Sequence, residues 1–433
     1  MSNVPRLAIR NCDQIVTICS KGQRFLSGTK QDQIEVRERD GDRGLSIVFG
    51  QDGLIKTIDY DDKIDDWLQK FCENDAKKVM KIIDGKGRSI IPGLVDAHCH
   101  PIWSGDRVNE FDLKLRGATY MKIHKSGGGI NKTVRETKHS KEEELLRTLL
   151  KRIKSMVRCG STTIECKTGY GLDYGSEKKL LQVIKQAASF TKAKIVTTFL
   201  GAHSIPEGMT AEQGVENVLN ILDKLREDNE DFDFVDVFCE KDIYDAQQTE
   251  RMLLYAKKNF PNCEITLHGD ELSDQNCGAL AARIGARSVS HLEFLNNSGI
   301  EAMAAKKIAA IINPTTCYLL QLPKPPVRRM IEASVPIVLA TDYNPNAMCY
   351  SLPMVMNLAA VQLGMTLNEC LVATTLNASY ALNLSDKCGS LEVGKKGDCL
   401  LLNCSDWRSL IAEFGDTVSL IDKVIIGGCV VEN

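Results

Sequence analysis

The sequence predicts an α/β protein: a (β/α)8 TIM-like barrel together with a small β-sandwich domain built from both chain ends. Two observations predict the barrel. Short apolar segments alternate with amphipathic helical segments over residues 91–385, which is the pattern of a parallel sheet with helical connections. Polar residues suited to chemistry directly follow these apolar segments, as in barrels whose active site lies at the C-terminal ends of the strands. A third observation, strand-like segments near both termini, predicts the β domain.

Residues 1–90 are predicted to form the N-terminal part of the β domain. Polar or glycine turns separate its strand-like segments, which are residues 7–9, 14–18, 45–49 and 54–58. The strongly charged stretch 31–43 is predicted to be a solvent loop. Within residues 61–81, apolar side chains at helical spacing predict a surface helix with one buried face; they are Ile64, Trp67, Leu68 and Phe71.

The predicted barrel begins at residues 91–101, Ile-Pro-Gly-Leu-Val-Asp-Ala-His-Cys-His-Pro. Pro92 and Gly93 end the preceding segment, and residues 94–97 form a short apolar run typical of a buried strand. His98 and His100 stand two residues apart, so on an extended chain both imidazoles point the same way. Such a pair is half of a metal site, although in isolation it is also compatible with two ordinary hydrogen-bonded histidines.

Seven further apolar segments complete a set of eight predicted barrel strands: residues 162–166, 195–200, 234–239, 264–268, 288–291, 308–312 and 337–340. One connecting helix is predicted in detail. Ser140 and Glu143 have the spacing of a capping box, large apolar residues recur on one face over residues 145–157, and Gly160 ends the helix.

The chain after residue 385 is predicted to complete the β domain. Residues 389–404 have a turn-and-strand pattern, and residues 424–431 resemble another strand. These segments resemble the N-terminal ones, so we expect both ends to join in one domain beside the barrel. The predicted domains are therefore residues 1–90 and 386–433, which share the β domain, and residues 91–385, the barrel.

Five of the seven histidines follow predicted barrel strands. His98 and His100 follow the first strand, and His203 the third. His268 and His291 end the fifth and sixth, and Asp342 follows the eighth. Strand ends of a barrel meet on one face, so these side chains are expected to converge there. His124 and His139 lie outside the set and are expected to be surface or structural residues.

The set His98, His100, His268 and Asp342 predicts a site for one metal ion, zinc or iron, with an open position for water. Hydroxide held by the metal is the expected nucleophile. Glu271, three residues after His268, is the predicted proton carrier, a role that Asp342 can share, and His291 is predicted to stabilise the developing oxyanion. An alternative role for Glu271 is to cap the helix that follows.

Composition limits the classes of partner and compartment. With 43% apolar and 26% charged residues and a net charge of −3, the chain has the make-up of a globular protein without a basic field for nucleic acid or anionic membranes. No apolar stretch suits a secretory signal or a membrane span. The 16 cysteines are scattered without a Cys-x-x-Cys pair, which is typical of buried thiols in a reducing compartment. We expect a cytoplasmic protein.

Three motifs resemble those of the amidohydrolase superfamily: residues 92–100, the Leu-His-Gly-Asp-Glu of 267–271 and the Ala-Thr-Asp-Tyr-Asn-Pro of 340–345. Further motifs resemble one family within it, which opens 4-imidazolone-5-propanoate to N-formimidoyl-L-glutamate in histidine degradation. These motifs are residues 105–107, 116–117, 127–130, 167–172, 201–206 and 342–345. The resemblance covers about residues 90–385 and implies hydrolysis of a cyclic amide.

The narrower resemblance also implies substrate contacts. Arg107 would bind the substrate's carboxylate tail, while Tyr170 and His203 would contact the ring and Asn344 would offer amide hydrogen bonds. Asn346 and Ala347 stand where the bacterial pattern usually has Gly-Ser, and Asn346 is included among the candidate substrate contacts. Glu271 completes that set. The resemblance further suggests a homodimer. From the residues alone, a surface ion pair of Arg107 with Asp106 or Glu110 is an equally good interpretation.

Two other functions fit parts of the pattern. A deaminase of a heterocyclic base would use the same ligands and the same glutamate, although a neutral base needs no carboxylate clamp such as Arg107. A non-catalytic scaffold is expected to lack several metal ligands, whereas here the complete set is present.

Overall fold

The computed structural model describes residues 4–71, 80–118, 122–123 and 127–431. The chain divides into two compact units. One comprises Met1–Val95, Lys154–Thr163 and Ser351–Asn433, and the other comprises Asp96–Ile153 and Ile164–Tyr350. Among the described helices, none combines the length and the apolar composition that crossing a membrane requires.

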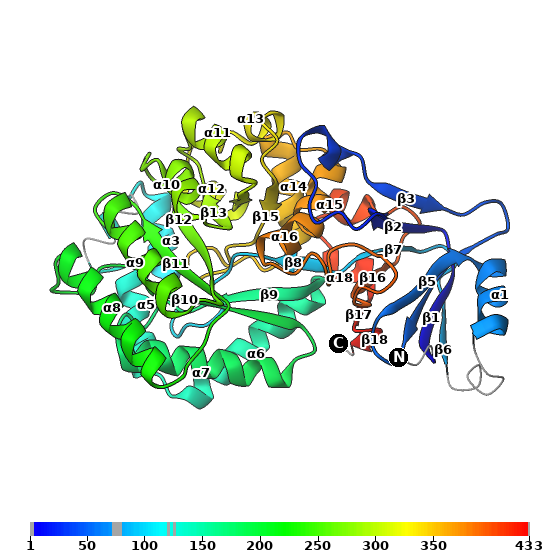
Figure 1. The fold of residues 1–433 in the computed structure, drawn as a ribbon, viewed down its shortest axis with the longest axis horizontal. Helices are drawn as coiled ribbons and strands as arrows, with labels where there is room; N and C mark the ends of the chain where they lie inside the picture. The colour runs from blue at the N-terminus through cyan, green and yellow to red at the C-terminus, as the bar shows by residue number, and fades with distance from the viewer. Residues whose placement is uncertain (1–3, 72–79, 119–121, 124–126, 432–433) are drawn as a thin grey trace. The chain divides into compact units, whose positions relative to one another are not determined.

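The first unit contains two sheets built from both chain ends (Figure 1). One sheet has the order β5-β4-β1-β6, with β1 Pro5–Cys12, β4 Leu45–Gly50, β5 Ile55–Tyr60 and β6 Lys81–Asp84. The other has the order β18-β17-β16-β7-β2-β3, with β2 Gln14–Ile18, β3 Glu35–Glu38, β7 Ser89–Pro92, β16 Cys399–Leu402, β17 Ile421–Ile426 and β18 Cys429–Val431. Apolar side chains from both sheets share one core, which includes Ile9, Ile47, Ile90 and Leu401.

The pairing of β7 with β16 joins the N-terminal and C-terminal segments in one sheet, with Ile91 opposite Leu400. This confirms that the two chain ends build the β-sheet part together. The strands expected within residues 7–9, 14–18, 45–49 and 54–58 correspond to β1, β2, β4 and β5.

One N-terminal prediction needs correction. The stretch 31–43 is not simply a solvent loop, because it contains β3, which pairs with β2 at the edge of the sheet, and because Gln31 is fully buried. Charged side chains are common on edge strands, and they concealed this strand in the sequence. The helix expected within 61–81 is present as α1, Asp61–Phe71, which buries Ile64 and Leu68, and Lys81 begins β6.

An eight-stranded parallel sheet forms the nearly closed barrel, in the order β15-β14-β13-β12-β11-β10-β9-β8. Its strands are β8 Leu94–Asp96, β9 Ser161–Lys167, β10 Lys194–Ala202, β11 Phe234–Cys239, β12 Glu264–Gly269, β13 Ser288–His291, β14 Ala309–Ile312 and β15 Ile337–Leu339. All eight predicted barrel strands are confirmed. Beyond the ends of β8 and β15, the Asp342 amide donates to the His98 carbonyl (2.9 Å) and the His100 amide to the Tyr343 carbonyl (2.9 Å), which links the first strand's loop to the last.

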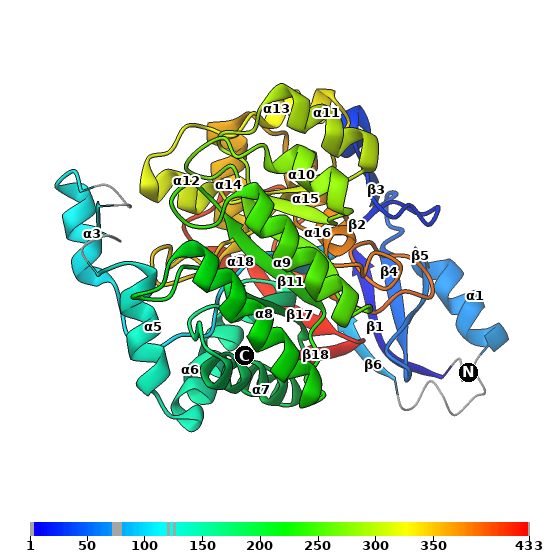
Figure 2. The ribbon, with the colours of Figure 1, turned by 60° about the vertical axis from the view of Figure 1, so that its left-hand side comes forward.

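Helices connect the barrel strands, and Figure 2 shows α7, α8 and α9 following one another along the chain's green section. The helices from α3 to α9 are α3 Val108–Leu115, α5 Ile130–His139, α6 Glu142–Arg158, α7 Tyr174–Phe190, α8 Ala211–Glu227 and α9 Ala246–Asn259. The later ones are α10 Cys277–Ile284, α11 Asn297–Lys306, α12 Pro314–Leu320, α13 Val327–Glu332, α14 Leu352–Leu363, α15 Leu367–Ala373, α16 Leu376–Ala381, α17 Ser409–Ala412 and α18 Thr417–Leu420.

The helix predicted after residue 140 is α6, but its predicted cap is wrong. Ser140 is instead the C-cap of α5, and its hydroxyl donates to the Glu136 carbonyl (3.0 Å). Helix α5 extends to His139, so the Ser140 hydroxyl bonds to the last turn of α5 and does not cap α6. Three glutamates in the first turn of α6 suit the positive end of its dipole. Gly160, with φ +97°, lies just beyond its end, as predicted.

Candidate metal centre and active site

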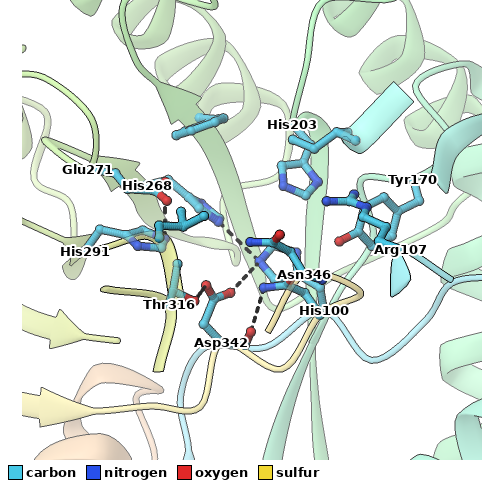
Figure 3. A pocket seen from close by; sticks show the side chains of 14 residues that line it. His100, Arg107, Tyr170, His203, His268, Glu271, His291, Thr316, Asp342 and Asn346 are labelled. Atoms are coloured by element: carbon cyan, nitrogen blue, oxygen red, sulfur yellow. Dashed lines mark hydrogen bonds and ion pairs between the residues drawn. The ribbon is translucent and has the colours of Figure 1, made fainter. Parts of the chain in front are cut away.

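The imidazoles of His98, His100 and His268 and the carboxylate of Asp342 converge at the C-terminal ends of the barrel strands. Figure 3 shows His100, His268 and Asp342 of this set. His100 Nε2 lies 3.4 Å from His98 Nε2 and 3.3 Å from His268 Nε2. Asp342 Oδ1 lies 3.5 Å from His98 Nε2 and 3.4 Å from His100 Nε2. All four side chains are buried. The structure therefore brings together the four residues that the sequence predicts as metal ligands.

The outer ring nitrogens of two of these histidines are already engaged. His268 Nδ1 lies 3.0 Å from Asp236 Oδ1, and a carboxylate can only accept, so His268 Nδ1 carries the proton. His98 Nδ1 contacts Ser290 Oγ at 2.8 Å. Protonation of the outer nitrogen leaves a lone pair on Nε2, which points into the cluster.

His98 and His100 are not expected to carry a second proton, so proton sharing does not explain the short distances between their ring nitrogens and the Asp342 carboxylate. Burial lowers the pKa of His100 to about 4 and of His98 well below its usual range, with Lys167 adding to the effect on His98. Burial alone raises the pKa of Asp342, but contacts with His100 and His98 bring it well below its usual range. Neutral imidazole lone pairs and a carboxylate oxygen thus face one another, an arrangement that a cation stabilises. The donor set fits a metal ion.

The peptide backbone at the cluster has unusual conformations. Asp342 has φ +46° and His291 has φ +79°, both in a region that side chains other than glycine rarely adopt. Each such residue costs about 1–3 kcal/mol and persists only where its surroundings hold it. Thr316 Oγ1, 2.5 Å from Asp342 Oδ2, is one such constraint because it fixes the carboxylate oxygen that faces away from the histidines.

The cluster includes more histidines than the predicted ligand set. His203 and His291 also belong to groups whose nitrogen atoms lie within 4.8 Å of other ring nitrogens. The His203 ring stacks on His100 with centroids 4.8 Å apart, and its Nδ1 lies 3.2 Å from the Gly169 carbonyl oxygen. Burial, reinforced by His100 and His268, lowers the pKa of His203 well below its usual range. Geometry alone therefore leaves several overlapping ligand sets.

Glu271 lies beside the cluster, with Oε2 3.8 Å from His291 Nε2. Burial, together with Glu293 and Asp342, raises the pKa of Glu271 well above its usual range, while burial lowers the pKa of His291 to about 3. Asn276 is the residue at the N-cap of α10. Glu271 thus does not cap the following helix and faces the pocket instead.

Arg107 lines the same pocket and is buried. Its Nε donates to Thr133 Oγ1 at 2.9 Å, and its Nη2 has no hydrogen-bond partner. Glu110 instead accepts from the Gly129 amide (2.9 Å), and Asp106 from the Val108 amide (3.0 Å). Among the described residues, Arg107 therefore lacks the surface ion pair that the sequence left open.

Tyr170 is buried, and its ring centroid lies 5.2 Å from that of His203. Its loop, part of the Lys-Thr-Gly-Tyr-Gly-Leu motif, is held by the buried Glu177 of α7, which accepts from the amides of Gly171 (2.7 Å) and Leu172 (2.9 Å). Gly169 has φ +104°, and a Cβ there would lie 2.9 Å from His203 Nδ1. The motif's glycines thus allow Tyr170 and His203 to approach each other.

Asn344 and Asn346 both line the pocket. The Asn344 side chain is engaged within its own loop, because Nδ2 donates to the Asp342 carbonyl (2.7 Å) and Oδ1 accepts from the Asn346 amide (2.7 Å). Asn346 Oδ1 accepts a hydrogen bond from Lys114 Nζ. Asn344 therefore shapes the turn after Asp342, and Asn346 connects that turn to α3.

Several residues around the cluster were not predicted. They are Asp236 and Ser290, which contact His268 and His98, Thr316, and the buried pair Glu165 and Lys167. The sequence signal for Asp236 is a charge inside the otherwise apolar strand β11, since buried charges are rare unless paired. Glu165 and Lys167 lie on the more polar strand β9, and Lys167 also begins the motif of residues 167–172. His139 lies in α5 and its Nδ1 contacts the Arg135 carbonyl (2.6 Å), whereas His124 lies outside the described residues.

Comparison with known proteins defines the class. Guanine deaminase of E. coli has a similar fold, with a TM-score of 0.71, 14% identity and 100% coverage of both chains. A triazine hydrolase variant gives a TM-score of 0.72 at 15% identity, covering 99% of this chain and 95% of the other. At these identities the likeness concerns the fold alone. The amidohydrolase family model matches residues 89–431. The fold and the histidine cluster are thus those of an amidohydrolase.

Closer relatives narrow this class. The chain is 44% identical over 433 residues to the "Probable imidazolonepropionase" of Homo sapiens, covering 99% of both chains. It is 42% identical over 417 residues to the protein of the same name from Dictyostelium discoideum, covering 95% of both. The chain belongs to the imidazolonepropionase family of amidohydrolases.

Proposed function

We propose that this protein hydrolyses the cyclic amide of 4-imidazolone-5-propanoate to N-formimidoyl-L-glutamate. One observation carries the proposal: a buried cluster suited to a metal shares its pocket with the unpaired Nη2 of the buried Arg107. A carboxylate-bearing ring that spans these two features is the substrate class they fit. The family membership selects the particular ring.

The metal is proposed to be one zinc or iron ion per subunit, held by His98, His100, His268 and Asp342. Both metals accept imidazole nitrogen and carboxylate oxygen. When bound there, the ion would lower the pKa of a water molecule toward neutrality and polarise the ring carbonyl.

Arg107 and its neighbours would orient the substrate. The free Nη2, with Nε on Thr133, suits the substrate's propanoate carboxylate. His203 donates from Nδ1 to Gly169, so its Nε2 is free to accept from a ring N–H of the substrate. Figure 3 shows Arg107, Tyr170 and His203 on one side of His100 and Asp342, with Glu271 and His291 on the other. A substrate bound to Arg107 through its carboxylate would therefore extend past His100 and Asp342 toward Glu271 and His291.

Glu271 would take a proton from the attacking water as the water oxygen bonds to the ring carbonyl carbon. It would then return that proton to the ring nitrogen as the carbon–nitrogen bond breaks, leaving a neutral formimidoyl nitrogen and a carboxylic acid that releases its remaining proton to solvent to become the carboxylate. His291, neutral because burial lowers its pKa to about 3, would donate an N–H to the carbonyl oxygen as negative charge develops. Asp342 is proposed to share the proton with Glu271.

The test is the loss of ultraviolet absorbance of freshly prepared 4-imidazolone-5-propanoate, with N-formimidoyl-L-glutamate identified by mass. Purified protein of known metal content is compared with Glu271→Gln. If the parent turns the substrate over and a Glu271→Gln variant that retains metal is almost inactive, both the reaction and the role of Glu271 are supported. A metal-loaded parent that leaves the substrate intact overturns the proposal. Ammonia release from heterocyclic amines would then establish a deaminase.

Two further properties are proposed. A homodimer is suggested by the family and is checked by sedimentation. A cytoplasmic location is supported by the described cysteines, all of which are free thiols and most of which are buried. Localisation of a tagged full-length chain tests it.

A further inference from the structure

A fully buried lysine lies inside the barrel, behind the histidine cluster. Lys167 Nζ forms ion pairs with Glu165 Oε1 at 2.8 Å and with Asp236 Oδ2 at 2.7 Å. These two partners come from neighbouring parts of the sheet, Glu165 from β9 and Asp236 from β11. Burial alone lowers the pKa of Lys167, but the charges of Asp236 and Glu165 raise it overall, so the ammonium group stays charged.

Asp236 connects this lysine to a predicted metal ligand. Its Oδ1 accepts from the His268 backbone amide at 3.1 Å and contacts His268 Nδ1 at 3.0 Å. Its Oδ2 is the atom that receives the Lys167 hydrogen bond. Asp236 Oδ2 also lies 3.0 Å from His268 Nδ1, so the His268 ring faces both carboxylate oxygens while Lys167 holds one of them. Together these contacts fix the plane of the carboxylate.

We propose that Lys167 is a positioning residue for the metal centre, acting through Asp236 to keep the Nε2 of His268 directed into the cluster. Lys167 is fully buried and is not among the residues that line the pocket, so it has no route to the substrate. A hydrogen bond that a metal-binding histidine donates to an outer carboxylate fixes the tautomer and orientation of the ring, and losing it typically weakens metal binding about 10- to 100-fold. Without Lys167, Asp236 Oδ2 would lose the hydrogen bond from the ammonium group and keep only its contact with His268 Nδ1, so the carboxylate would be free to turn.

The alternative is that Lys167, Glu165 and Asp236 form an ion-pair network that contributes to folding alone. Glu165 helps to separate the two interpretations, because it contacts Lys167 and Thr198 (2.5 Å) but makes no described contact with His268. The inference rests on the proposed metal site and not on the proposed substrate, so it is tested by metal binding.

The experiment measures zinc affinity of the metal-free full chain by competition with a chromophoric chelator. It compares the parent, Lys167→Met and the double variant Lys167→Met/Glu165→Gln. The double variant keeps the net charge of the three-residue group unchanged, so it is expected to fold even where the single variant leaves two carboxylates unpaired. The matched control is Lys395→Met in the other unit. Lys395 is also a buried lysine, paired with Glu392 at 2.9 Å.

We expect zinc to bind about 10- to 100-fold more weakly in the folded Lys167 variants than in the parent, and Lys395→Met to bind like the parent. The visible spectrum of the cobalt-substituted variants is expected to change as well, because the ligand field reports the orientation of His268. Folded double-variant protein with parental zinc affinity and an unchanged cobalt spectrum overturns the inference. A parent that binds no zinc overturns the metal site itself, whereas a parent that binds zinc but leaves the substrate intact overturns only the proposed reaction.

Discussion

At the scale of single residues, each side chain of the cluster is constrained by a contact outside it. Ser290 contacts His98, Asp236 contacts His268, and Thr316 contacts Asp342. The exception is His100, whose Nδ1 is buried without a hydrogen-bond partner. Its ring is instead held between others, stacked on His203 at a 4.8 Å centroid separation. Packing and hydrogen bonds thus share the work of orienting the imidazoles.

The overlapping histidine groups lead to a test of the ligand set. We predict that His268→Gln loses metal and that His203→Gln retains it, because His203 Nδ1 is engaged by Gly169 and its role is proposed to be substrate contact. The loss in His268→Gln is expected to exceed the about 10- to 100-fold effect of losing an outer contact. Metal content after dialysis, measured by atomic emission, checks both. Loss of metal in His203→Gln would show that His203 belongs to the ligand set, and retention of metal in His268→Gln would contradict the proposed set.

Arg107 provides a prediction about substrate binding. Arg107→Met is expected to lower kcat/KM about 10- to 100-fold, mainly through KM, because a charge-assisted hydrogen bond to the substrate carboxylate is lost. Steady-state kinetics with the imidazolone substrate measures this. Arg251→Met is the control, since Arg251 is an exposed arginine that pairs with Glu212 (2.6 Å) on the helical surface. An unchanged KM in Arg107→Met would contradict the proposed clamp.

At the scale of elements, the site depends on how loops leave the barrel strands. The loop after β9 is fixed by Glu177, a residue of the following helix, whose carboxylate accepts from three backbone amides, those of Gly169, Gly171 and Leu172. The start of α7 therefore determines where Tyr170 lies. The cap of that helix is Asp173, which accepts from the Ser176 amide at 2.9 Å.

The cap of α7 gives a pH-dependent prediction. Burial alone raises the pKa of Asp173, but Lys138 and the Ser176 amide lower it overall. Because the folded pKa lies below the unfolded value of about 3.9, the carboxylate stabilises the fold above that pH, and the effect is lost as the pH falls through the folded pKa. We expect Asp173→Ala to cost about 1 kcal/mol at pH 7 and progressively less below about pH 4.

Urea unfolding midpoints between pH 7 and the lowest pH at which the parent stays folded measure this difference. Thr210→Ala is the control, because Thr210 caps α8 with a hydroxyl that does not titrate in this range. Its cost, about 1 kcal/mol, is expected to be the same at every pH. Equal pH dependence in the two variants would contradict the role assigned to the Asp173 charge.

At the scale of the whole molecule, metal binding is expected to contribute to stability. A ligand that binds only the folded state stabilises it by about 4 kcal/mol at a free concentration 1,000 times its Kd. We therefore predict that the melting temperature of the parent rises with free zinc and falls on chelation. The double variant His98→Gln/His100→Gln is expected to melt at a temperature that does not depend on zinc. Scanning calorimetry measures both, and a parent unaffected by chelation would argue against a resident metal.

The domain boundaries predicted at residues 90/91 and 385/386 stay a prediction.

The sequence predicts the bounds of the barrel strands to within one or two residues of those in the structure. They are short apolar runs between polar turns, and both features are local properties of the chain. The strand β3 was missed because its charged residues suit a solvent loop equally well, and its pairing partner β2 lies further back in the sequence.

The set of candidate metal ligands could be predicted from the sequence alone, because a barrel places the residues after each strand on one face whatever lies between them. The family could be predicted from the sequence motifs. The alternatives left open for Arg107 and Glu271 needed the structure. It shows Arg107 without an ion pair among the described residues, and Glu271 lining the same pocket while Asn276 occupies the N-cap of α10. The same holds for Lys167 and Asp236, which are 69 residues apart in the chain and 2.7 Å apart in space. The sequence determined the strand ends, because local periodicity marks them, and strand ends bring the ligands to one face. The pairing of buried charges was determined only by the tertiary structure, because it depends on packing between strands that are distant in the sequence.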